Sequence, residues 1–298
     1  MLVHECTLWR DYIRQRCGLC FSDSRLWFLR QSLWERMRLR GTQSYREYYH
    51  YVATPPAGEA EWLALLEGLL NHETGFFRHP PSFTALTEHV FPELLGDGLP
   101  TDPIIMWSAG CSTGQEAYSL AMVFLELTAP PTAMRAPRTA SGKRAGPQAR
   151  VIGSDISSLA LHKARSGLYK PYEIRSLPDS YRQRYFTMAE DGSQTVYQVG
   201  PRLQVMVEFG YINLHDPASS PFAPLPFMGG RGEGVDVIFC QNVLIYFTSE
   251  DRLAIVQRLC QRLRPGGCLF LGPAEVVGLR LPGIQSVQLP DVLLYQRI

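Results

Sequence analysis

The sequence lacks an excess of charge of either sign. Its 298 residues include 29 Lys and Arg against 28 Asp and Glu, which gives a formal net charge of +1 at pH 7. Such a balance provides no overall attraction for nucleic acid or for an anionic membrane surface. We therefore expect no nucleic-acid partner, and any charged partner has to be recognised by a local group of residues.

Long apolar runs are also absent. No uninterrupted apolar stretch approaches the roughly 20 residues of a membrane-spanning helix. The opening segment, MLVHECTLWRDYIRQRC, lacks the basic start, apolar block and small-residue cleavage site of a signal peptide. The sequence therefore predicts a soluble, cytoplasmic protein that does not insert into a membrane.

Cysteine is scarce, odd in number and scattered, with seven residues in the chain. This usage fits reduced thiols better than a disulfide framework. Cys17 and Cys20 form one CxxC, but no second CxxC or HxxxH supplies further metal ligands and no strand precedes it. We expect buried or idle thiols here rather than a zinc or redox site, and no bound metal.

Residues 1–70 are predicted to be helical throughout, because apolar residues such as Leu26, Leu29 and Leu33 recur at helical spacing. Residues 1–50 contain nine arginines, no lysine and five acids. Two readings of this basic segment stay open. It is either a solvated helical face or a docking surface for an acidic helical partner.

A different pattern begins at residue 103, where short apolar strands alternate with helical stretches. This alternation predicts a mostly parallel sheet with helices on both faces and with ligands beyond the carboxyl ends of the strands. The predicted strands are PIIMW (103–107), ARVIGSD (149–155), VDVIFCQN (235–242) and GCLFLG (267–272). The predicted helices are QEAYSLAMVFLEL (115–127), SLALHKARSG (158–167) and EDRLAIVQRLCQRLR (250–264).

Three further segments interrupt this alternation. TVYQVG and RLQVMVEF suggest two antiparallel strands that form a small β appendage at about residues 190–210. Residues 128–150 and 217–234 are rich in proline and glycine, and we expect them to be surface loops.

The first predicted strand leads into the glycine turn GCSTG (110–114), which is followed by a helix. The turn lacks the GxGxxG spacing of a dinucleotide site and the GK[ST] of a P-loop, so a pyrophosphate is disfavoured. Asp155, at the end of the next strand, could either cap the following helix or accept both hydroxyls of a ribose. Its position after the second strand favours the ribose.

The later segment LRPGGCLFLG (263–272) provides a helix end, a tight turn and an apolar strand, in an order that resembles the late core of Rossmann-like methyltransferases. S-adenosylmethionine, the cofactor of such enzymes, has a ribose and an adenine but no phosphate. A looser glycine turn is then sufficient.

Four segments together resemble the CheR-type methyltransferases, which use S-adenosylmethionine to esterify glutamate side chains of chemotaxis receptors. They are NHETGFFRHPPSF (71–83), WSAGCSTGQEAYSLAM (107–122), GSDISSLALHKARSGLY (153–169) and FCQNVLIYF (239–247). The resemblance implies an α/β fold: an N-terminal all-helical docking domain at 1–70, and at 71–298 a Rossmann-like class I methyltransferase domain with a mostly parallel sheet and a small antiparallel β appendage. The implied acceptor lies in the cytoplasmic helical domain of a receptor, and we expect a monomer.

The resemblance also implies roles for individual residues. Arg78 and Tyr246 are the implied catalytic residues, with Arg78 contacting both cofactor and acceptor. Glu116 corresponds to a carboxylate near the methionine amine, and Asp155 to the ribose ligand. The implied cofactor-binding residues are Thr74, Arg78, Gly110, Glu116, Asp155, Asn213, Leu214, Gln241 and Asn242.

Some positions depart from the pattern of this family. His72 stands where the family often has Asn, Gln241 replaces the usual arginine of FCRN, and GPAEV (272–276) replaces the usual GHSE. These changes bear on cofactor affinity rather than on the fold. They also motivate an alternative, a non-catalytic module that keeps the fold. A methyltransferase that acts on a non-chemotactic signalling protein is a further alternative.

An NAD-dependent oxidoreductase would use the same layout of strands and helices. It is disfavoured because GCSTG is a poor pyrophosphate turn and because the FFR segment (76–78) would have no explanation. Methyl transfer also needs no strong general base, since a glutamate carboxylate, with a reference pKa of about 4.3, is already an ionised nucleophile at pH 7.

Overall fold

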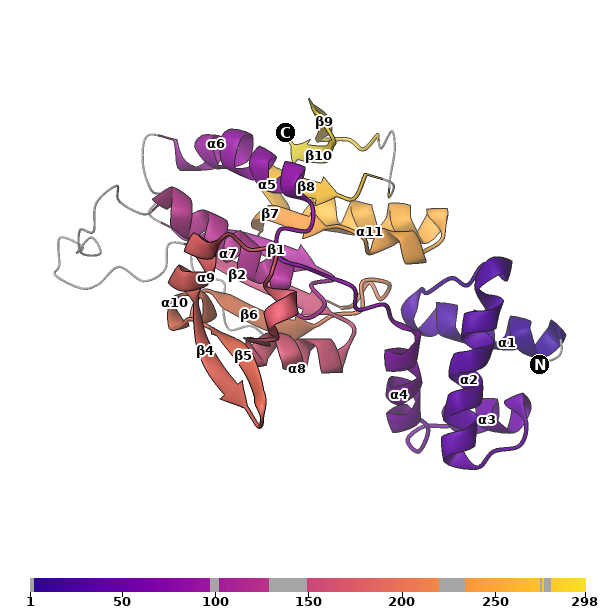
Figure 1. Cartoon of the computed structure of the whole chain (residues 1–298). Helices are drawn as coiled ribbons and strands as arrows, with labels where there is room; N and C mark the ends of the chain where they lie inside the picture. The colour runs from indigo at the N-terminus through magenta and orange to yellow at the C-terminus, as the bar shows by residue number, and fades with distance from the viewer. Residues whose placement is uncertain (1–2, 97–101, 129–148, 220–233, 274, 276–279) are drawn as a thin grey trace.

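The computed structural model of the chain describes residues 3–96, 102–128, 149–219, 234–273, 275 and 280–298 (Figure 1). The surface loops expected at 128–150 and 217–234 lie almost wholly outside these ranges. All seven cysteines lie within them and are free thiols. None of the helices in these ranges has the length and apolarity needed to span a membrane.

The N-terminal part is a bundle of helices, as expected from its sequence. Its elements are α1 (Val3–Cys17), η1 (Asp23–Arg25), α2 (Leu26–Arg40), α3 (Tyr45–Val52) and α4 (Glu59–Leu69). Trp9, Ile13, Leu29, Leu33 and Leu65 are fully buried in its core. Figure 1 shows this bundle beside the remainder of the chain, joined to it by the segment that follows α4.

A buried carboxylate ties three helices of the bundle together. Glu61 of α4 is fully buried and accepts hydrogen bonds from Arg36 and Arg40 of α2 and, at 2.9 Å, from the Tyr48 hydroxyl of α3. Burial alone would raise the pKa of Glu61, but these hydrogen bonds outweigh it and lower the pKa overall. The ionised carboxylate is therefore a stabilising part of the helical core.

The larger part contains a seven-stranded sheet in the order β6-β2-β1-β7-β8-β10-β9. Its strands are β1 (Ile104–Ala109), β2 (Ala149–Asp155), β6 (Val207–Tyr211), β7 (Val235–Cys240), β8 (Leu263–Leu271), β9 (Ile284–Leu289) and β10 (Val292–Arg297). The first five in this order are parallel, and β10 runs antiparallel to both of its neighbours. Every residue of β1 and β7 is buried, as in a sheet that is covered on both faces.

Helices cover the two faces of this sheet. On one face, α5 (Pro80–Ala85), η2 (Leu86–Val90), α6 (Phe91–Leu95) and α7 (Gln115–Thr128) share an apolar core with alternate residues of the central strands. On the other face, α11 (Ser249–Arg262) packs against the intervening residues. The Rossmann-like fold, mostly parallel and covered on both sides, is thereby confirmed. Other helical elements in the described ranges are α8 (Ser158–Ser166), η3 (Pro171–Glu173), α9 (Asp179–Tyr185) and η4 (Leu244–Tyr246).

A small antiparallel sheet is present, but its strands differ from the predicted pair. Its order is β3-β5-β4, from β3 (Leu168–Tyr169), β4 (Phe186–Asp191) and β5 (Gln194–Val199). The predicted second strand, RLQVMVEF, is wrong: it begins with the short helix α10 (Pro201–Gln204) and continues as β6, which pairs in parallel with β2. Proline at the start of α10 favours this short helix. The residues of β6 then form a strand because they pair with β2.

The C-terminal hairpin β9–β10 was not predicted. Two strands thus follow GCLFLG, the last of the strands predicted from the sequence. The segment IQSVQL of β9 has no continuous apolar pattern and is largely exposed, so only its pairing with β10 makes it a strand.

Replacing Glu61 by Gln removes the charge that Arg36 and Arg40 surround. We expect a loss of about 3 kcal/mol in the free energy of unfolding at pH 7, measured by urea denaturation. Because the pKa of Glu61 is lowered on folding, its contribution is complete above the unfolded value and disappears as the pH falls below about 4. The exposed Glu35→Gln on α2 serves as the control, with a change within about 0.5 kcal/mol. An equally small change for Glu61→Gln would contradict this account.

Candidate active site

The candidate site lies at the edge of the sheet where three central parallel strands end. Gly110 follows β1, Asp155 ends β2, and Gln241 follows β7. The register places Ala109 of β1 beside Ser154 of β2. These chain ends therefore surround one cavity of about 310 Å³, within the size range of small-molecule sites.

All of the predicted site residues line this cavity. They are Thr74, Arg78, Gly110, Glu116, Asp155, Asn213, Leu214, Gln241, Asn242 and Tyr246. Other lining residues were not foreseen from the sequence. Cys17, Leu19, Leu69 and Leu70 come from the helical bundle, so the bundle forms one wall of the cavity.

Gly110 allows the turn after β1 to pack closely against the loop that follows β7. Its φ is +84°, and a Cβ atom there would lie 2.3 Å from Cγ2 of Val243. Its N–H donates to the Ser154 carbonyl at 2.7 Å, and the Cys111 N–H donates to the same oxygen at 2.8 Å. A side chain at position 110 would fill the space beside the loop that follows β7.

Asp155 is held by backbone donors from two loops. Its carboxylate accepts from the N–H of Ser112 at 2.8 Å and from the N–H of Ser157 at 2.9 Å. Ser157, not Asp155, is the N-cap of α8, because its hydroxyl accepts from the N–H of Ala160. The helix-cap interpretation of Asp155 is therefore wrong. A carboxylate has about four acceptor positions, so two remain for ligand hydroxyls.

Glu116 at the start of α7 is a second carboxylate at the cavity. The Ser108 hydroxyl donates to it at 2.7 Å. Burial raises the pKa of Glu116 to about 7, the nearby Glu275 adds to the increase, and the Ser108 hydrogen bond and Arg78 oppose it. A cationic group of a ligand would favour the ionised form at this position.

The loop after β7 is fixed by Glu275, which is not among the residues predicted for the site. This buried carboxylate accepts from the N–H of Val243 at 2.6 Å, of Leu244 at 2.7 Å and of Gly272 at 2.6 Å. Within the same loop Asn242 has a φ of +62°. Glu275 thus sets the backbone that carries Asn242 and Tyr246 at the cavity. Glu275 is the glutamate of GPAEV, and the usual GHSE of the family also contains a glutamate. This shared residue could have indicated its importance from the sequence.

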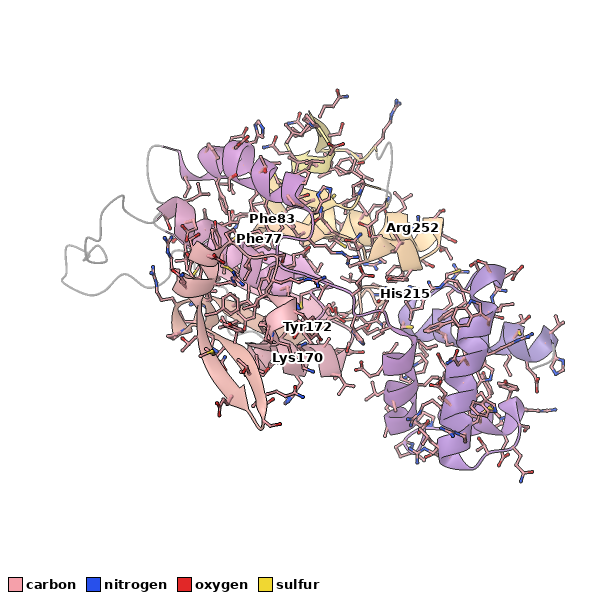
Figure 2. The ribbon with its side chains drawn as sticks, viewed as in Figure 1. Phe77, Phe83, Lys170, Tyr172, His215 and Arg252 are labelled. Carbon is pink, nitrogen blue, oxygen red and sulfur yellow. The ribbon has the colours of Figure 1, made fainter. Side chains whose placement is uncertain are left out.

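The bundle holds the Tyr246 side of the cavity through the turn at CGLC (17–20). The N–H of Cys20 donates to the Tyr246 carbonyl at 2.8 Å, and the Arg25 guanidinium lies 5.5 Å from the centroid of the Tyr246 ring. Gly18 packs so closely that a Cβ there would lie 2.6 Å from Phe247 and 2.8 Å from His215. Figure 2 shows His215 on the side of the Rossmann-like part that faces the bundle. The CxxC motif therefore lies at the contact between the helical bundle and the Rossmann-like part.

Asn213 and Glu67 make further bonds between the two parts. The amide nitrogen of Asn213 donates to the Arg16 carbonyl at 2.8 Å, and its oxygen accepts from the His215 N–H at 3.1 Å. Glu67 of α4 accepts from the Ser157 hydroxyl at 2.6 Å, next to Asp155. The side chain of Asn213, which the family resemblance places at the cofactor, is thus already hydrogen-bonded within the protein through both its amide nitrogen and its amide oxygen.

The segment that carries Arg78 is anchored by aromatic contacts. The ring centroids of Phe77 and Phe83 lie 4.9 Å apart (Figure 2). The N–H of Phe77 donates to the Ser119 hydroxyl of α7 at 3.1 Å. Arg78 itself is partly exposed and donates to the Glu73 carbonyl at 2.8 Å. Its guanidinium is therefore at the mouth of the cavity, held by a local contact.

These donors and acceptors fit S-adenosylmethionine. The carboxylate of Asp155 suits a pair of hydroxyls, and the part-buried carboxylate of Glu116 suits an ammonium group. No group of three or more His, Cys, Asp or Glu in the described ranges is placed to hold a metal ion. Fold and site together define an S-adenosylmethionine-dependent methyltransferase of the Rossmann-like class.

Comparison with known proteins identifies the family. Residues 72–288 match the CheR methyltransferase SAM binding domain, and residues 4–70 match the CheR methyltransferase all-alpha domain. The chain belongs to the CheR methyltransferase family, which confirms the resemblance noted in the sequence.

Several relatives align over most of the chain. Chemotaxis protein methyltransferase 2 of Vibrio cholerae is 33% identical over 266 residues, which cover 89% of this chain and 83% of the relative. Chemotaxis protein methyltransferase 1 of Pseudomonas aeruginosa is 30% identical, with coverage of 97% and 96%. The chemotaxis protein methyltransferase of Escherichia coli is also 30% identical, with coverage of 88% and 81%.

Gly110→Ala should weaken binding of S-adenosylhomocysteine by about tenfold or more, because the new methyl group displaces Val243 at the cavity floor. Gly266→Ala is a matched control, since Gly266 has a similar φ of +79° but no atom within 4 Å of its added Cβ. Both variants bear the strain of a positive φ, roughly 1–2 kcal/mol. Calorimetry that gave equal affinities for the two variants would contradict the close contact assigned to Gly110.

Proposed function

We propose that this protein transfers the methyl group of S-adenosylmethionine to glutamate side chains in the cytoplasmic helical domain of a chemotaxis-type receptor, forming glutamyl methyl esters. The observation that carries the proposal is one cavity that combines Asp155 and Glu116 with Arg78 and Tyr246. Further support comes from relatives named chemotaxis protein methyltransferases that cover most of the chain.

Two carboxylates and several other residues that line the cavity would hold the cofactor. Asp155 would accept the ribose hydroxyls and Glu116 would pair with the methionine ammonium. Thr74, Leu214 and the chain at Gln241 and Asn242 would line the remainder. The bound cofactor supplies a methyl group on a positively charged sulfur, activated for in-line displacement.

The acceptor needs alignment more than activation. A glutamate carboxylate is already ionised at pH 7, so the residues at the cavity mouth only have to orient it. Arg78 would bind it as a planar two-donor fork, and the Tyr246 hydroxyl would add one more hydrogen bond. Holding two reactants in near-attack geometry contributes several kcal/mol to lowering the barrier. Too many charged bonds to the carboxylate would reduce its nucleophilicity, which favours a neutral donor such as Tyr246.

The arrangement of the chain suggests how a receptor helix reaches the cavity. We propose that residues 1–70 form the docking domain and residues 71–298 the methyltransferase domain, with α4 ending at Leu69. The arginine-rich bundle forms one wall of the cavity, so an acidic helix bound to it would present its glutamates at Arg78 and Tyr246. A monomer in the cytoplasm, where receptor signalling domains lie, fits this proposal.

The direct test is transfer of labelled methyl from S-adenosylmethionine to a purified receptor cytoplasmic fragment, followed by mild base. Label released as volatile methanol would establish ester formation on glutamate. Label that is stable to base would overturn the glutamate assignment. No label despite tight binding of S-adenosylhomocysteine would overturn the receptor as acceptor.

Tyr246→Phe removes the hydroxyl that we assign to acceptor orientation. We expect kcat to fall by about ten- to a hundredfold, the value of a hydrogen bond to a charged group, with affinity for S-adenosylhomocysteine within about twofold of wild type. Tyr172→Phe, on an exposed tyrosine outside the cavity, is the control. An equal loss of turnover and cofactor binding would remove Tyr246 from this role.

The raised pKa of Glu116 predicts a pH-dependent affinity. Since the pKa is about 7 in the free protein and an ammonium group binds the ionised form, affinity for S-adenosylhomocysteine should rise with pH from 6 to 8. Well below pH 7 the loss approaches tenfold for each pH unit. Glu116→Gln should bind more weakly, with a flatter profile. Calorimetric profiles of the same slope for both proteins would show that Glu116 is not the group that titrates.

A further inference from the structure

A chain of hydrogen bonds connects Gln241 to His79, a cavity residue with no role in the function proposed above. The Nε2 atom of Gln241 donates to the Ser82 hydroxyl at 2.8 Å and to the Leu271 carbonyl at 3.3 Å. The Ser82 hydroxyl in turn lies 2.8 Å from Nδ1 of His79. Ser82 is fully buried, while His79 and Gln241 both line the cavity.

The direction of these bonds can be assigned from their chemistry. The Leu271 carbonyl can only accept, so the Gln241 atom that faces it is the amide nitrogen, and the Ser82 oxygen accepts from the same nitrogen. The single hydroxyl hydrogen of Ser82 then points to Nδ1 of His79. The opposite direction would leave a fully buried hydroxyl hydrogen without this acceptor, at a cost of about 1–3 kcal/mol.

This assignment fixes the tautomer of His79. A ring nitrogen that accepts a hydrogen bond carries no proton, so the proton of the neutral ring is on Nε2. Burial lowers the pKa of His79, opposed by Asp291 in the β9–β10 turn, and this favours the neutral ring at pH 7. His79, which lines the cavity, therefore carries one neutral N–H donor at Nε2.

We propose that the Nε2–H group of His79 donates a hydrogen bond to a carboxylate bound in the cavity, and that Ser82 and Gln241 are positioning residues that fix its tautomer. The inference rests on the proposed function, in which two carboxylates enter the cavity: the cofactor's methionine carboxylate and the acceptor glutamate. Carboxylates only accept hydrogen bonds, and Arg78 beside His79 provides the cationic partner.

The proposal also explains the amide at position 241. Gln241 occupies the place of the usual arginine of FCRN, but its amide nitrogen is directed to Ser82 and Leu271. The lost cation is thus replaced by a neutral donor on a different residue. A neutral N–H orients a carboxylate while withdrawing less charge from it than a second guanidinium would.

The tautomer can be measured without any acceptor. Nitrogen-15 NMR of the imidazole rings at pH 7 should show His79 neutral, protonated at Nε2 and unprotonated at Nδ1. Ser82→Ala should abolish the preference for this tautomer, whereas removal of the exposed His89 by His89→Ala should leave the His79 signals unchanged. A proton on Nδ1 of His79 in the wild-type protein would overturn the proposal.

The carboxylate is identified by comparing His79→Phe, His79→Gln and the control His89→Ala. If the cofactor carboxylate is the partner, His79→Phe lowers affinity for S-adenosylhomocysteine by about tenfold or more in calorimetry. If the acceptor is the partner, that affinity is unchanged and KM for the receptor fragment rises or kcat falls by a similar factor. In either case His79→Gln, which keeps an N–H donor, should recover part of the loss.

Unchanged affinity and unchanged kinetics in His79→Phe would overturn the proposal. A wild-type protein that methylates no receptor fragment would instead overturn the proposed function. The NMR and calorimetric measurements on His79 do not depend on that result, so the two failures can be told apart.

Discussion

The site depends on one constraint, which is that parallel strands end at the same edge of a sheet. β1, β2 and β7 are neighbours in parallel register, so the loops after them converge although they are separated by up to about 130 residues in the chain. Gly110, Asp155 and Gln241 meet for this reason. The cavity is therefore a consequence of strand order, and the chemistry depends on the side chains placed at these three strand ends.

Carboxylates at the cavity then hold these loops in place. Glu275 accepts hydrogen bonds from backbone N–H groups of the loop after β7. Asp155 accepts them from the loops after β1 and β2. Glu67 of the helical bundle likewise accepts a hydrogen bond from the Ser157 hydroxyl in the loop after β2. Without these carboxylates, the backbone N–H groups in the loops would lack hydrogen-bond partners. One carboxylate that accepts from several N–H groups therefore orders a loop that has little apolar packing of its own. The bundle is in this way part of the cavity wall.

Much of the fold and site could be predicted because the signals were local. Continuous apolar runs marked β1, β2, β7 and β8, and the turns that follow three of these strands marked Gly110, Asp155 and Gln241. The family resemblance indicated the lining residues outside these turns, Thr74, Arg78, Asn213 and Leu214. What could not be predicted depends on contacts between distant segments. β6 belongs to the main sheet because it pairs with β2. β9 belongs to it because it pairs with β10. The wall formed by Cys17 and Leu19, and the bond between Ser82 and Gln241, likewise have no local signature.

The central claim is that the bundle and the sheet edge form a single cofactor cavity. Hydrogen exchange of the whole protein, with and without saturating S-adenosylhomocysteine, tests it most directly. The account predicts slower exchange of backbone amides at 110–116 and 242–246 and, at the same time, at 17–20 in the bundle. Protection at the strand ends with no change at 17–20 would contradict the shared cavity, and no protection at either would contradict the cofactor site itself.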